Sequence, residues 1–569
     1  LFRSSAASDV YKRQGKDALG ANTTGAQNTA VGQNAMGSTT TATDNCAFGH
    51  SALAGTNTGS GRNNAFGYEA LQDITTGTQN QAMGFQAGAN LTTGSYNNIM
   101  GAEAMENSTT ASNCVAIGHD ALRQNEGNNN IAIGFQALTA NTTASNNTAI
   151  GHAALGSNTT ASYNCAFGYY ALYDNQSGTS NNAFGYAALE NNTASANCAF
   201  GSYTLQANTT GGNNTAVGHR ALDGAVTMSN NTAIGAQCMT GSVTGGQNTA
   251  VGTESLEANT GGDDNVAVGY RALEANTTGA RNVAVGRVAL GSQATESNCT
   301  AVGYYALGDN STGSENSAFG SNCMDALTTG NYNDAFGRDA LGTGTGFSEC
   351  CAFGNSALKL NTGDHNCAFG FSALVANTSG ARNTAFGHRA LESNTTAVNN
   401  TAVGDYALSD CTTGVDNTAV GREALQYCTT GFHNTAVGQE SQKAVTTGGY
   451  NSSIGHNSLK ALTDGIQNNA VGAQAMHQLT TGSYNAALGA DTAVDLTTGG
   501  NNVFLGHDAG RANSPGGAVT TGSNNIILGN NNTTALYCAD TSISSSDSRD
   551  KTDIDCLLYT SDAADERNS

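Results

Sequence analysis

A short unit repeats along almost the whole chain, and this repetition restricts the possible folds more than any other feature. The unit reads N-T-A-V-G-x-x-A-L-x-x-N-T-T-G-x-x and is 17 residues long. Its first glycine, here called the anchor glycine, recurs at a nearly constant spacing from Gly15 to Gly506, and one longer step leads to Gly529. Self-similarity at a fixed period indicates a repeat protein in which each unit stacks on the next.

The composition of the unit favours β-structure. So short a unit cannot contain two helices with their connections, and Asn, Thr and Gly are typical of turns. The segment 214–218 (N-T-A-V-G) is expected to be a strand with Thr215 and Val217 on one face and Ala216 on the other. A second short segment, Ala221–Leu222, is expected to place its leucine inside.

These patterns predict an all-β fold, a parallel β-solenoid or β-roll of about 30 coils over residues 15–529. With coils about 4.8 Å apart, the rod would be roughly 140 Å long. Each coil would bury one Val, Phe or Ile, one Leu or Met, and small residues, which is a thin core. We therefore expect a further face to be covered by copies of the chain, and the recurrent strand alanine would allow close approach of another layer or chain. A homotrimer is the preferred arrangement, although the sequence does not determine the number of chains.

Charge and motif content argue against several functions. The formal net charge of −22 disfavours nucleic acid as a partner, and no run of 18 apolar residues exists that could insert into a membrane. Carboxylates are scattered without a facing pair, so no hydrolase site is expected within the rod. We expect no cofactor and no metal site, because no C-x-x-C pair exists and other residues interrupt the histidines.

The position directly after the anchor glycine often carries a ring, which predicts a column of rings along the rod. One interpretation is a binding stripe for a glycan or receptor, and the other, which we favour, is a ladder of rings in a turn or subunit seam. Phe85, Phe135 and Phe371 hold the same position. The candidate binding residues are His50, Tyr68, His119, His152, Tyr169, Tyr186, His219, Tyr270, Tyr304 and His388.

The cysteines are interpreted as small buried residues. We assign Cys46, Cys114, Cys165, Cys198, Cys299, Cys351 and Cys367 to the threonine position of N-T-A-V-G. Cys411 and Cys428 hold the same repeat position as each other in consecutive coils. This spacing permits either a disulfide or two free thiols, and we favour the thiols.

One resemblance concerns the repeat itself. The segment 213–218, N-N-T-A-V-G, resembles the N-S-V-A-I-G repeat of YadA-like trimeric adhesin heads. Those heads are left-handed parallel β-rolls in which three chains pack side by side. The resemblance covers nearly all of residues 15–529, although the period of this chain is longer and Thr or Cys stands where that family has Val.

A second resemblance follows an expected exit linker at residues 530–545. Residues 546–554, S-D-S-R-D-K-T-D-I, resemble the S-D-x-R-x-K-x-x-I opening of the peptidase S74 family. These domains are intramolecular chaperones of endosialidase-type phage tail spikes and fibres, which trimerise the fibre and then cut themselves off. The resemblance makes Ser546 the nucleophile and Lys551 its base, with residues 546–555 as the start of the domain. Such a module would align three chains whose nearly identical repeats leave the register weakly specified.

The two ends of the sequence are expected not to belong to the natural protein. Residues 4–14 read SSAASDVYKRQ and residues 556–566 read CLLYTSDAADE. DNA that encodes the first segment encodes the second when it is read as its reverse complement in a shifted frame. Both resemble translated adapter sequence, so we assign residues 1–14 and 556–569 to it.

The sequence thus predicts a structural and adhesive fibre and no enzyme within the rod, with self-cleavage only at the S74 junction. The preferred interpretation is a phage tail-fibre shaft or receptor-binding region, located on the virion. The alternative is the head of a bacterial trimeric autotransporter adhesin at the cell surface, and an ice-binding solenoid is a third, less favoured class. Expected partners are further copies of the chain and a host-cell surface receptor or glycan.

Overall fold

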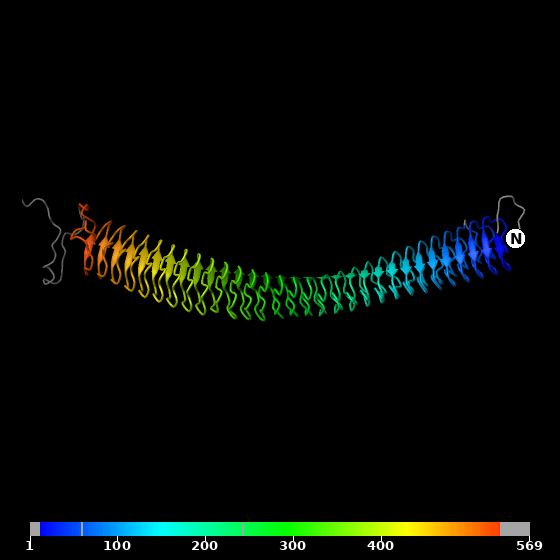
Figure 1. Ribbon diagram of the computed structural model, residues 1–569, viewed down its shortest axis with the longest axis horizontal. Helices are drawn as coiled ribbons and strands as arrows, with labels where there is room; N and C mark the ends of the chain where they lie inside the picture. The colour runs from blue at the N-terminus through cyan, green and yellow to red at the C-terminus, as the bar shows by residue number, and fades with distance from the viewer. Residues whose placement is uncertain (1–11, 59–60, 242–243, 535–569) are drawn as a thin grey trace, which may run out of the picture.

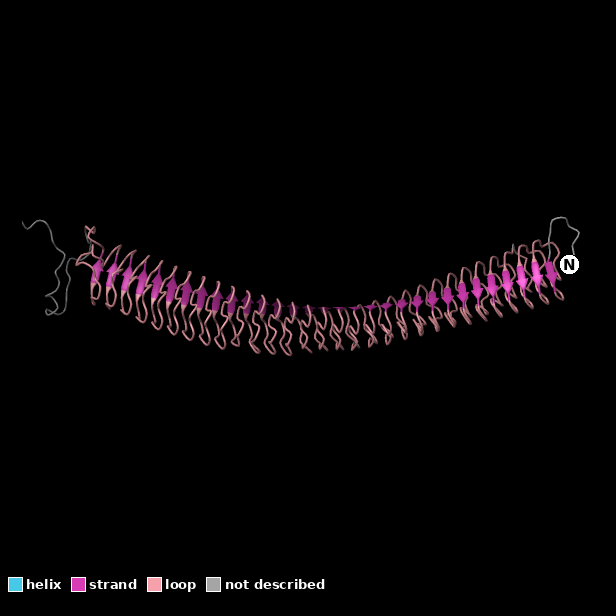
Figure 2. Cartoon of the chain, in the orientation of Figure 1, coloured by secondary structure: helices cyan, strands magenta, loops and turns pink. Residues whose placement is uncertain are grey.

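The chain folds into one gently curved rod of stacked coils (Figure 1). The structure is a computed structural model and describes residues 12–58, 61–241 and 244–534. Within these ranges there is no helix, and each coil contains a single strand of three residues, with turns making up the rest. The strands lie parallel along one side of the rod (Figure 2). This confirms the prediction of an all-β parallel solenoid with one coil per repeat.

All the strands belong to one 31-stranded parallel sheet. In chain order they are β1 (Lys12–Gln14), β2 (Thr29–Val31), β3 (Cys46–Phe48), β4 (Asn64–Phe66), β5 (Gln81–Met83), β6 (Asn98–Met100), β7 (Val115–Ile117), β8 (Ile131–Ile133), β9 (Thr148–Ile150), β10 (Cys165–Phe167), β11 (Asn182–Phe184), β12 (Cys198–Phe200), β13 (Thr215–Val217), β14 (Thr232–Ile234), β15 (Thr249–Val251), β16 (Val266–Val268), β17 (Val283–Val285), β18 (Thr300–Val302), β19 (Ser317–Phe319), β20 (Asp334–Phe336), β21 (Cys351–Phe353), β22 (Cys367–Phe369), β23 (Thr384–Phe386), β24 (Thr401–Val403), β25 (Thr418–Val420), β26 (Thr435–Val437), β27 (Ser452–Ile454), β28 (Asn469–Val471), β29 (Ala486–Leu488), β30 (Val503–Leu505) and β31 (Ile526–Leu528).

Neighbouring strands pair in register, so that each repeat position forms a column along the rod. In the β13–β14 pair, for example, Thr215 lies opposite Thr232, and Ala216 lies opposite Ala233. The longer final step is absorbed by the turns, because Val503 still pairs with Ile526. The first strand, β1, also pairs in register with β2, although it lies in the segment that we assign to adapter sequence. That assignment stays a prediction.

The anchor glycine is required by both its conformation and its surroundings. Gly218 has a φ of +134°, and a Cβ added to it would lie 2.4 Å from the carbonyl oxygen of Gly235 in the next coil. A larger residue would therefore clash with the neighbouring backbone and also be strained. Stacking of the anchor glycines thus fixes how closely successive coils approach.

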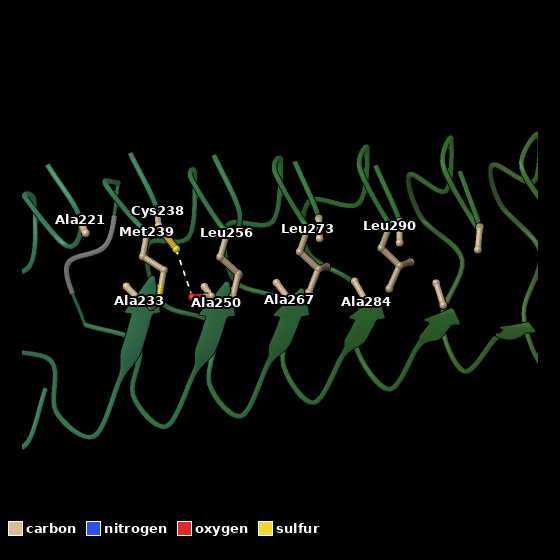
Figure 3. Packing of buried hydrophobic residues seen from close by; sticks show 14 of the residues in the cluster. Ala221, Ala233, Cys238, Met239, Ala250, Leu256, Ala267, Leu273, Ala284 and Leu290 are labelled. Atoms are coloured by element: carbon tan, nitrogen blue, oxygen red, sulfur yellow. Dashed lines mark hydrogen bonds between the residues drawn. The ribbon is translucent and has the colours of Figure 1, made fainter. Parts of the chain in front are cut away.

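The strand buries its alanine and exposes its Val, Phe or Ile. This is the reverse of the expectation that each coil buries the Val, Phe or Ile. Ala216 is fully buried, whereas Val217 is 37% exposed. The middle alanine of the strand therefore points into the core of its own chain, and the Val, Phe or Ile that follows it points outward. In a three-residue strand the first and third side chains share one face and the middle one has the other, and in this rod the middle one faces inward. Of the two partners expected for the alanine, another layer or another chain, the structure shows a layer of its own chain (Figure 3).

The interior is a narrow layer of alanine and leucine. Leu256, Leu273 and Leu290 face the strand alanines across the core (Figure 3), and all three are fully buried. The prediction that Leu222 lies inside is confirmed, but its segment is a turn, in which Leu222 has a φ of +54°. A left-handed leucine costs about 1–2 kcal/mol. Its burial contributes about 1.5–3 kcal/mol and offsets that strain.

Two ladders of buried asparagine run along the core. The first ladder is formed by the residue directly before each strand. The main-chain N–H of Asn231 donates to Oδ1 of Asn214 at 3.0 Å, and Nδ2 of Asn214 donates to the carbonyl of Met228 at 2.8 Å. The second ladder is formed by the asparagine of N-T-T-G, where Nδ2 of Asn276 donates to Oδ1 of Asn259 at 3.1 Å. These asparagines connect the coils through their side chains. The sequence analysis had treated asparagine only as a residue typical of turns.

Cysteine occurs in both ladders and on the outer face. Cys114 and Cys299 stand in the first asparagine ladder and are buried, so their assignment to the threonine position was wrong. The cysteines that do hold the threonine position are half-buried, because that position faces outward; they are Cys46, Cys165, Cys198, Cys351 and Cys367. Cys411 and Cys428 are buried free thiols in the second ladder.

We predict that Asn417→Ala will destabilise the rod. Oδ1 of Asn417 accepts from the N–H of Asn434 at 3.0 Å, and its Nδ2 donates to the carbonyl of Gly431 at 2.8 Å. Loss of both bonds leaves two buried groups unsatisfied, at a cost of about 2–4 kcal/mol. Urea denaturation followed by circular dichroism should show a lower midpoint.

Two further variants provide controls for this experiment. Asn355→Ala removes a half-buried amide outside both ladders and should change stability by less than about 0.5 kcal/mol. Asn417→Cys should have an intermediate effect, because Cys350 at the equivalent position keeps a contact from Sγ to the carbonyl of Gly363 at 3.3 Å. An Asn417→Ala rod as stable as Asn355→Ala would contradict the structural role of the ladder.

Candidate functional site

The largest exposed apolar feature is the column formed by the third residue of strands β2 to β31, here called the outer strand column. Every member is Val, Ile, Leu, Met or Phe. Phe386 at 56% and Leu488 at 54% are among the most exposed. From Phe319 to Phe369 the rings stack on one another with centroids 4.5 to 4.6 Å apart. The rod thus presents a continuous apolar stripe on the outside of its sheet.

The outer strand column contains one shallow hollow. It has a volume of about 190 Å³ and lies over β4 to β7, where Met83 and Met100 replace larger rings. The amide side chains of Asn64, Gln81 and Asn98 border it. The hollow opens on the same stripe, and it has no titratable or nucleophilic group of its own.

The ring column after the anchor glycine forms where the sequence placed it, but only in part. His50, Tyr68 and Phe85 stack with centroids 5.1 and 5.2 Å apart. A second stack joins rings of five consecutive coils at 4.8 to 5.5 Å, namely His119, Phe135, His152, Tyr169 and Tyr186.

The remaining candidates of the ring column do not join these stacks. His219 meets Tyr203 edge-on at 6.3 Å, and Tyr270 and Tyr304 lie on either side of the Arg287 guanidinium. His388 stacks on Phe371 at 5.6 Å, and its Nδ1 lies 2.9 Å from a carboxylate oxygen of Asp405. The chemistry of this column therefore changes along the rod from rings to charged pairs.

Stacking determines which part of each ring is available to a ligand. When rings stack at about 5 Å, the faces between them are covered, and only the ring edges and the outer faces of the two end rings remain exposed. A sugar that packs on an aromatic residue needs a free face, because the negative charge of the π-system lies there. The geometry of the two stacks is therefore that of a ladder, and a binding role for the ring column stays a prediction.

Charged residues bridge successive coils beside the ring column. The Arg123 guanidinium lies 3.0 Å from Glu103 and 2.8 Å from Glu106, and Arg271 lies 2.5 Å from Glu254. Burial, with the nearby carboxylates of Glu254 and Glu274, raises the pKa of Glu257. These pairs are half-exposed, so each contributes little to stability alone.

Two groups in the described part of the chain have ligand atoms close enough to hold a metal ion. They are Asp491 with His507 and Asp508, and Glu254 with Glu257 and Glu274. In the first group Arg511 already contacts Asp508 at 3.0 Å, and in the second Arg271 contacts Glu254. A side-chain cation thus already pairs with one carboxylate of each cluster, and we assign no metal to either cluster.

At one coil boundary a polar residue takes the leucine position of the core. Gln442 takes the usual leucine position, and its Nε2 donates to Oγ of Ser453 at 2.8 Å and to the carbonyl of Thr435 at 2.8 Å. Ser441 and Ser453 also form a hydrogen bond. On the outside of the same coils Nζ of Lys460 lies 2.5 Å from Glu440, and Lys443 contacts Glu423.

The predicted cleavage residues Ser546 and Lys551 lie outside the described residues, as does most of the expected linker. Among the residues that the structure covers, no helix is long and apolar enough to span a membrane. No protein-family model matches the chain, and no curated protein matches its sequence. We therefore infer the function from the exposed surfaces of the rod.

Sequence reasoning missed a third set of exposed rings. Tyr96, Tyr163, Tyr332 and Tyr484 each directly precede a first-ladder asparagine, at a position here called the corner column. All four are more than half exposed. The available signal was a bulky ring at a repeat position where asparagine is common, as at Asn146.

We predict that acid will loosen the coils around Glu440. The Lys460 ammonium, followed by Lys443, lowers the pKa of the Glu440 carboxyl from 4.5 to about 2. A depressed carboxyl pKa stabilises the folded state fully above pH 4.5, and this contribution is lost as the pH falls from 4.5 towards 2. Between pH 5 and pH 3 the urea midpoint should fall less in Glu440→Gln than in the unmodified chain.

The exposed residue Glu315 provides the control for the acid experiment, because it lies away from these lysines. Glu315→Gln should retain the full acid sensitivity of the unmodified chain. Equal acid sensitivity in Glu440→Gln and Glu315→Gln would show that the ion pairs of Glu440 do not stabilise the rod.

Proposed function

We propose that this chain is a segment of a self-assembling structural and adhesive fibre. The observation that carries the proposal is the outer strand column, which is apolar in every coil from β2 to β31. If each member exposes about 60 Å², the column presents roughly 1,800 Å² of apolar surface along the rod. Soluble monomers rarely expose contiguous patches of more than about 300–600 Å². A surface of this size matches what specific protein interfaces bury.

The partner that fits this stripe best is a second and third copy of the same rod. A partner must be as long as the stripe and repeat with the same spacing, and an identical chain meets both conditions. Around a threefold axis, three outer strand columns would form one shared apolar core with the stacked phenylalanines inside. This arrangement agrees with the resemblance of N-N-T-A-V-G to the repeats of trimeric YadA-like heads.

The preferred biological setting is a phage tail fibre, which would place the protein on the virion. The support is the resemblance of residues 546–554 to the opening of the S74 chaperone, with Ser546 as nucleophile and Lys551 as base for self-cleavage. The alternative setting is the head of a bacterial trimeric autotransporter adhesin. A complete chaperone domain in the full gene would favour the fibre, and a coiled coil with a membrane anchor would favour the adhesin.

We predict that the chain sediments as a trimer, at three times its mass of 57.4 kDa, and that the outer strand column holds the trimer together. Replacing Phe336, Phe353 and Phe369 with threonine should weaken the trimer, so that single chains appear at a higher protein concentration than in the unmodified protein. Threonine is well tolerated on an exposed strand face, so the solenoid itself should remain folded. Sedimentation velocity gives the mass, and circular dichroism reports the fold.

A matched control removes apolar surface from another column. Leu360 is 44% exposed and lies outside the sheet, so Leu360→Thr should leave the trimer intact. A single-chain mass for the unmodified protein would contradict the proposal, and so would a triple phenylalanine variant that dissociates no more readily than Leu360→Thr.

A further inference from the structure

One pair of cysteines lies side by side on the outer face of the sheet. Cys351 is the first residue of β21, Cys367 is the first residue of β22, and the two are register partners. Both are free thiols, and both are half-buried. Among the described residues, the other outward cysteines have no cysteine as a register partner; they are Cys46, Cys165 and Cys198. Stacking of the coils thus brings together two outward thiols that are one coil apart in the sequence.

The spacing of the coils puts the two cysteines within reach of a covalent bond. Paired residues of neighbouring strands have Cα atoms about 4.8 Å apart, and disulfides form across Cα separations of about 4.4–6.8 Å. Two residues further along the same strands, the rings of Phe353 and Phe369 stack with centroids 4.6 Å apart, so the side chains on this face run side by side. A disulfide holds its Cβ atoms about 3.8 Å apart, so the bond would draw the two strands together by roughly 1 Å.

The other neighbouring cysteines differ from this pair in access. Cys350 is 1% exposed, stands in the first asparagine ladder, and has its Sγ 3.3 Å from the carbonyl oxygen of Gly363. Cys411 and Cys428 also lie in consecutive coils, but both are fully buried, so a reagent in solution does not reach them in the folded chain. The outward pair therefore combines proximity with access, and the buried pair provides an internal comparison.

The surroundings of the two outward thiols indicate which one reacts first. Burial raises the pKa of Cys351 to about 12, and the neighbouring Cys367 and Asp334 groups add to the rise. Burial also raises the pKa of Cys367, but a hydrogen bond from the Cys351 thiol lowers it in part. The thiolate is the attacking form in thiol–disulfide exchange, so Cys367 is the first nucleophile.

We propose that Cys351 and Cys367 form a redox modification site, which a low-molecular-weight disulfide such as oxidised glutathione converts into a disulfide bond between two coils. The Cys367 thiolate attacks one sulfur of the reagent, the S–S bond of the reagent breaks, and one glutathione leaves and takes up a proton. Cys351 then gives its proton to solvent, attacks the Cys367 sulfur of the mixed disulfide, and displaces the second glutathione. Two protein thiols are oxidised, and one glutathione disulfide is reduced to two thiols.

The bond would act as a covalent staple across one coil boundary. It joins β21 to β22 and closes a loop of one coil, which restricts the unfolded chain and so favours the folded one. Both sulfur atoms come from the same chain, so the site does not depend on the proposed trimer.

The test is incubation of the full folded chain with oxidised glutathione at about pH 8.5, where thiolates form more readily than at neutral pH. The remaining thiols are then alkylated in denaturant, and peptide mapping without reduction identifies the joined cysteines. The expected product has a single disulfide between Cys351 and Cys367, with Cys411 and Cys428 recovered as alkylated thiols. Dithiothreitol should reverse the reaction, and the oxidised chain should denature at a higher urea concentration than the reduced one.

Two threonine variants provide the controls. Thr384 is the register partner of Cys367 in the next coil, so Cys367→Thr introduces a residue that this column already uses. That variant should form no disulfide within the chain, whereas Cys198→Thr should oxidise like the unmodified protein. The same incubation with the triple phenylalanine variant, at a concentration where it is a single chain, excludes covering of the pair by a trimer.

Any of four outcomes would overturn the inference. One is that Cys351 and Cys367 stay thiols in both the unmodified chain and the triple phenylalanine variant. A second is that the disulfide joins two chains, which the mass in denaturant would show. A third is that Cys411 and Cys428 oxidise in preference to the outward pair. The fourth is that the oxidised chain denatures at a lower urea concentration, which would show that the bond strains the coils.

Discussion

The buried asparagine ladder is the interaction on which the rest of the rod depends. Each coil has only three residues in a strand, and main-chain bonds between the turns of successive coils add to the sheet, as from the N–H of Leu222 to the carbonyl of Cys238 at 2.9 Å. The first-ladder asparagine adds side-chain bonds to the following coil, as Asn417 does by accepting from Asn434 and donating to Gly431. A buried polar group without a partner costs about 1–3 kcal/mol. A coil that lost its asparagine would leave the main-chain N–H and carbonyl groups that this side chain binds without hydrogen-bond partners. The ladder therefore fixes both the stacking and the register of the coils.

The ladder also determines where the large side chains lie. Asparagine, alanine and leucine fill most of the narrow interior, and the phenylalanine or valine at the third position of each strand lies on the opposite face of the sheet. These residues lie outside, where the in-register sheet aligns them into one stripe. The thin core and the exposed stripe are thus two consequences of the same short coil. A rod built in this way gains from association along its length.

Much of the fold could be predicted from the sequence because the period is so regular. The anchor glycines gave the coil length, the N-T-A-V-G segment gave the strand, and the A-L segment gave a buried leucine, as Leu222 shows. The orientation of the strand was missed, because alternation separates Thr215 and Val217 from Ala216 without saying which face is inside. A useful signal was present, since the small alanine varies little from coil to coil while its neighbour changes among Val, Ile and Phe.

The candidate site was predictable only at the level of columns. The ring column exists, but its stacking could not be predicted. The stacking from His119 to Tyr186 depends on a coil spacing that brings the centroids of neighbouring rings within stacking distance. The buried role of asparagine was hidden because the same residue is common in turns, and this also concealed the placement of Cys114. The corner tyrosines were missed although they stand at a repeat position where asparagine, which readily adopts a left-handed backbone, is common.

The central claim is that each repeat makes one coil and that the coils stack in register into a single rod. Small-angle X-ray scattering of the chain in solution tests it directly. A rod of roughly 140 Å has a radius of gyration of about 40 Å, and side-by-side association of rods leaves that length almost unchanged. A compact globule of this chain length would give about 25 Å. The larger radius with a rod-like scattering profile is the expected result, and the smaller, globular radius would contradict the stacked-coil structure.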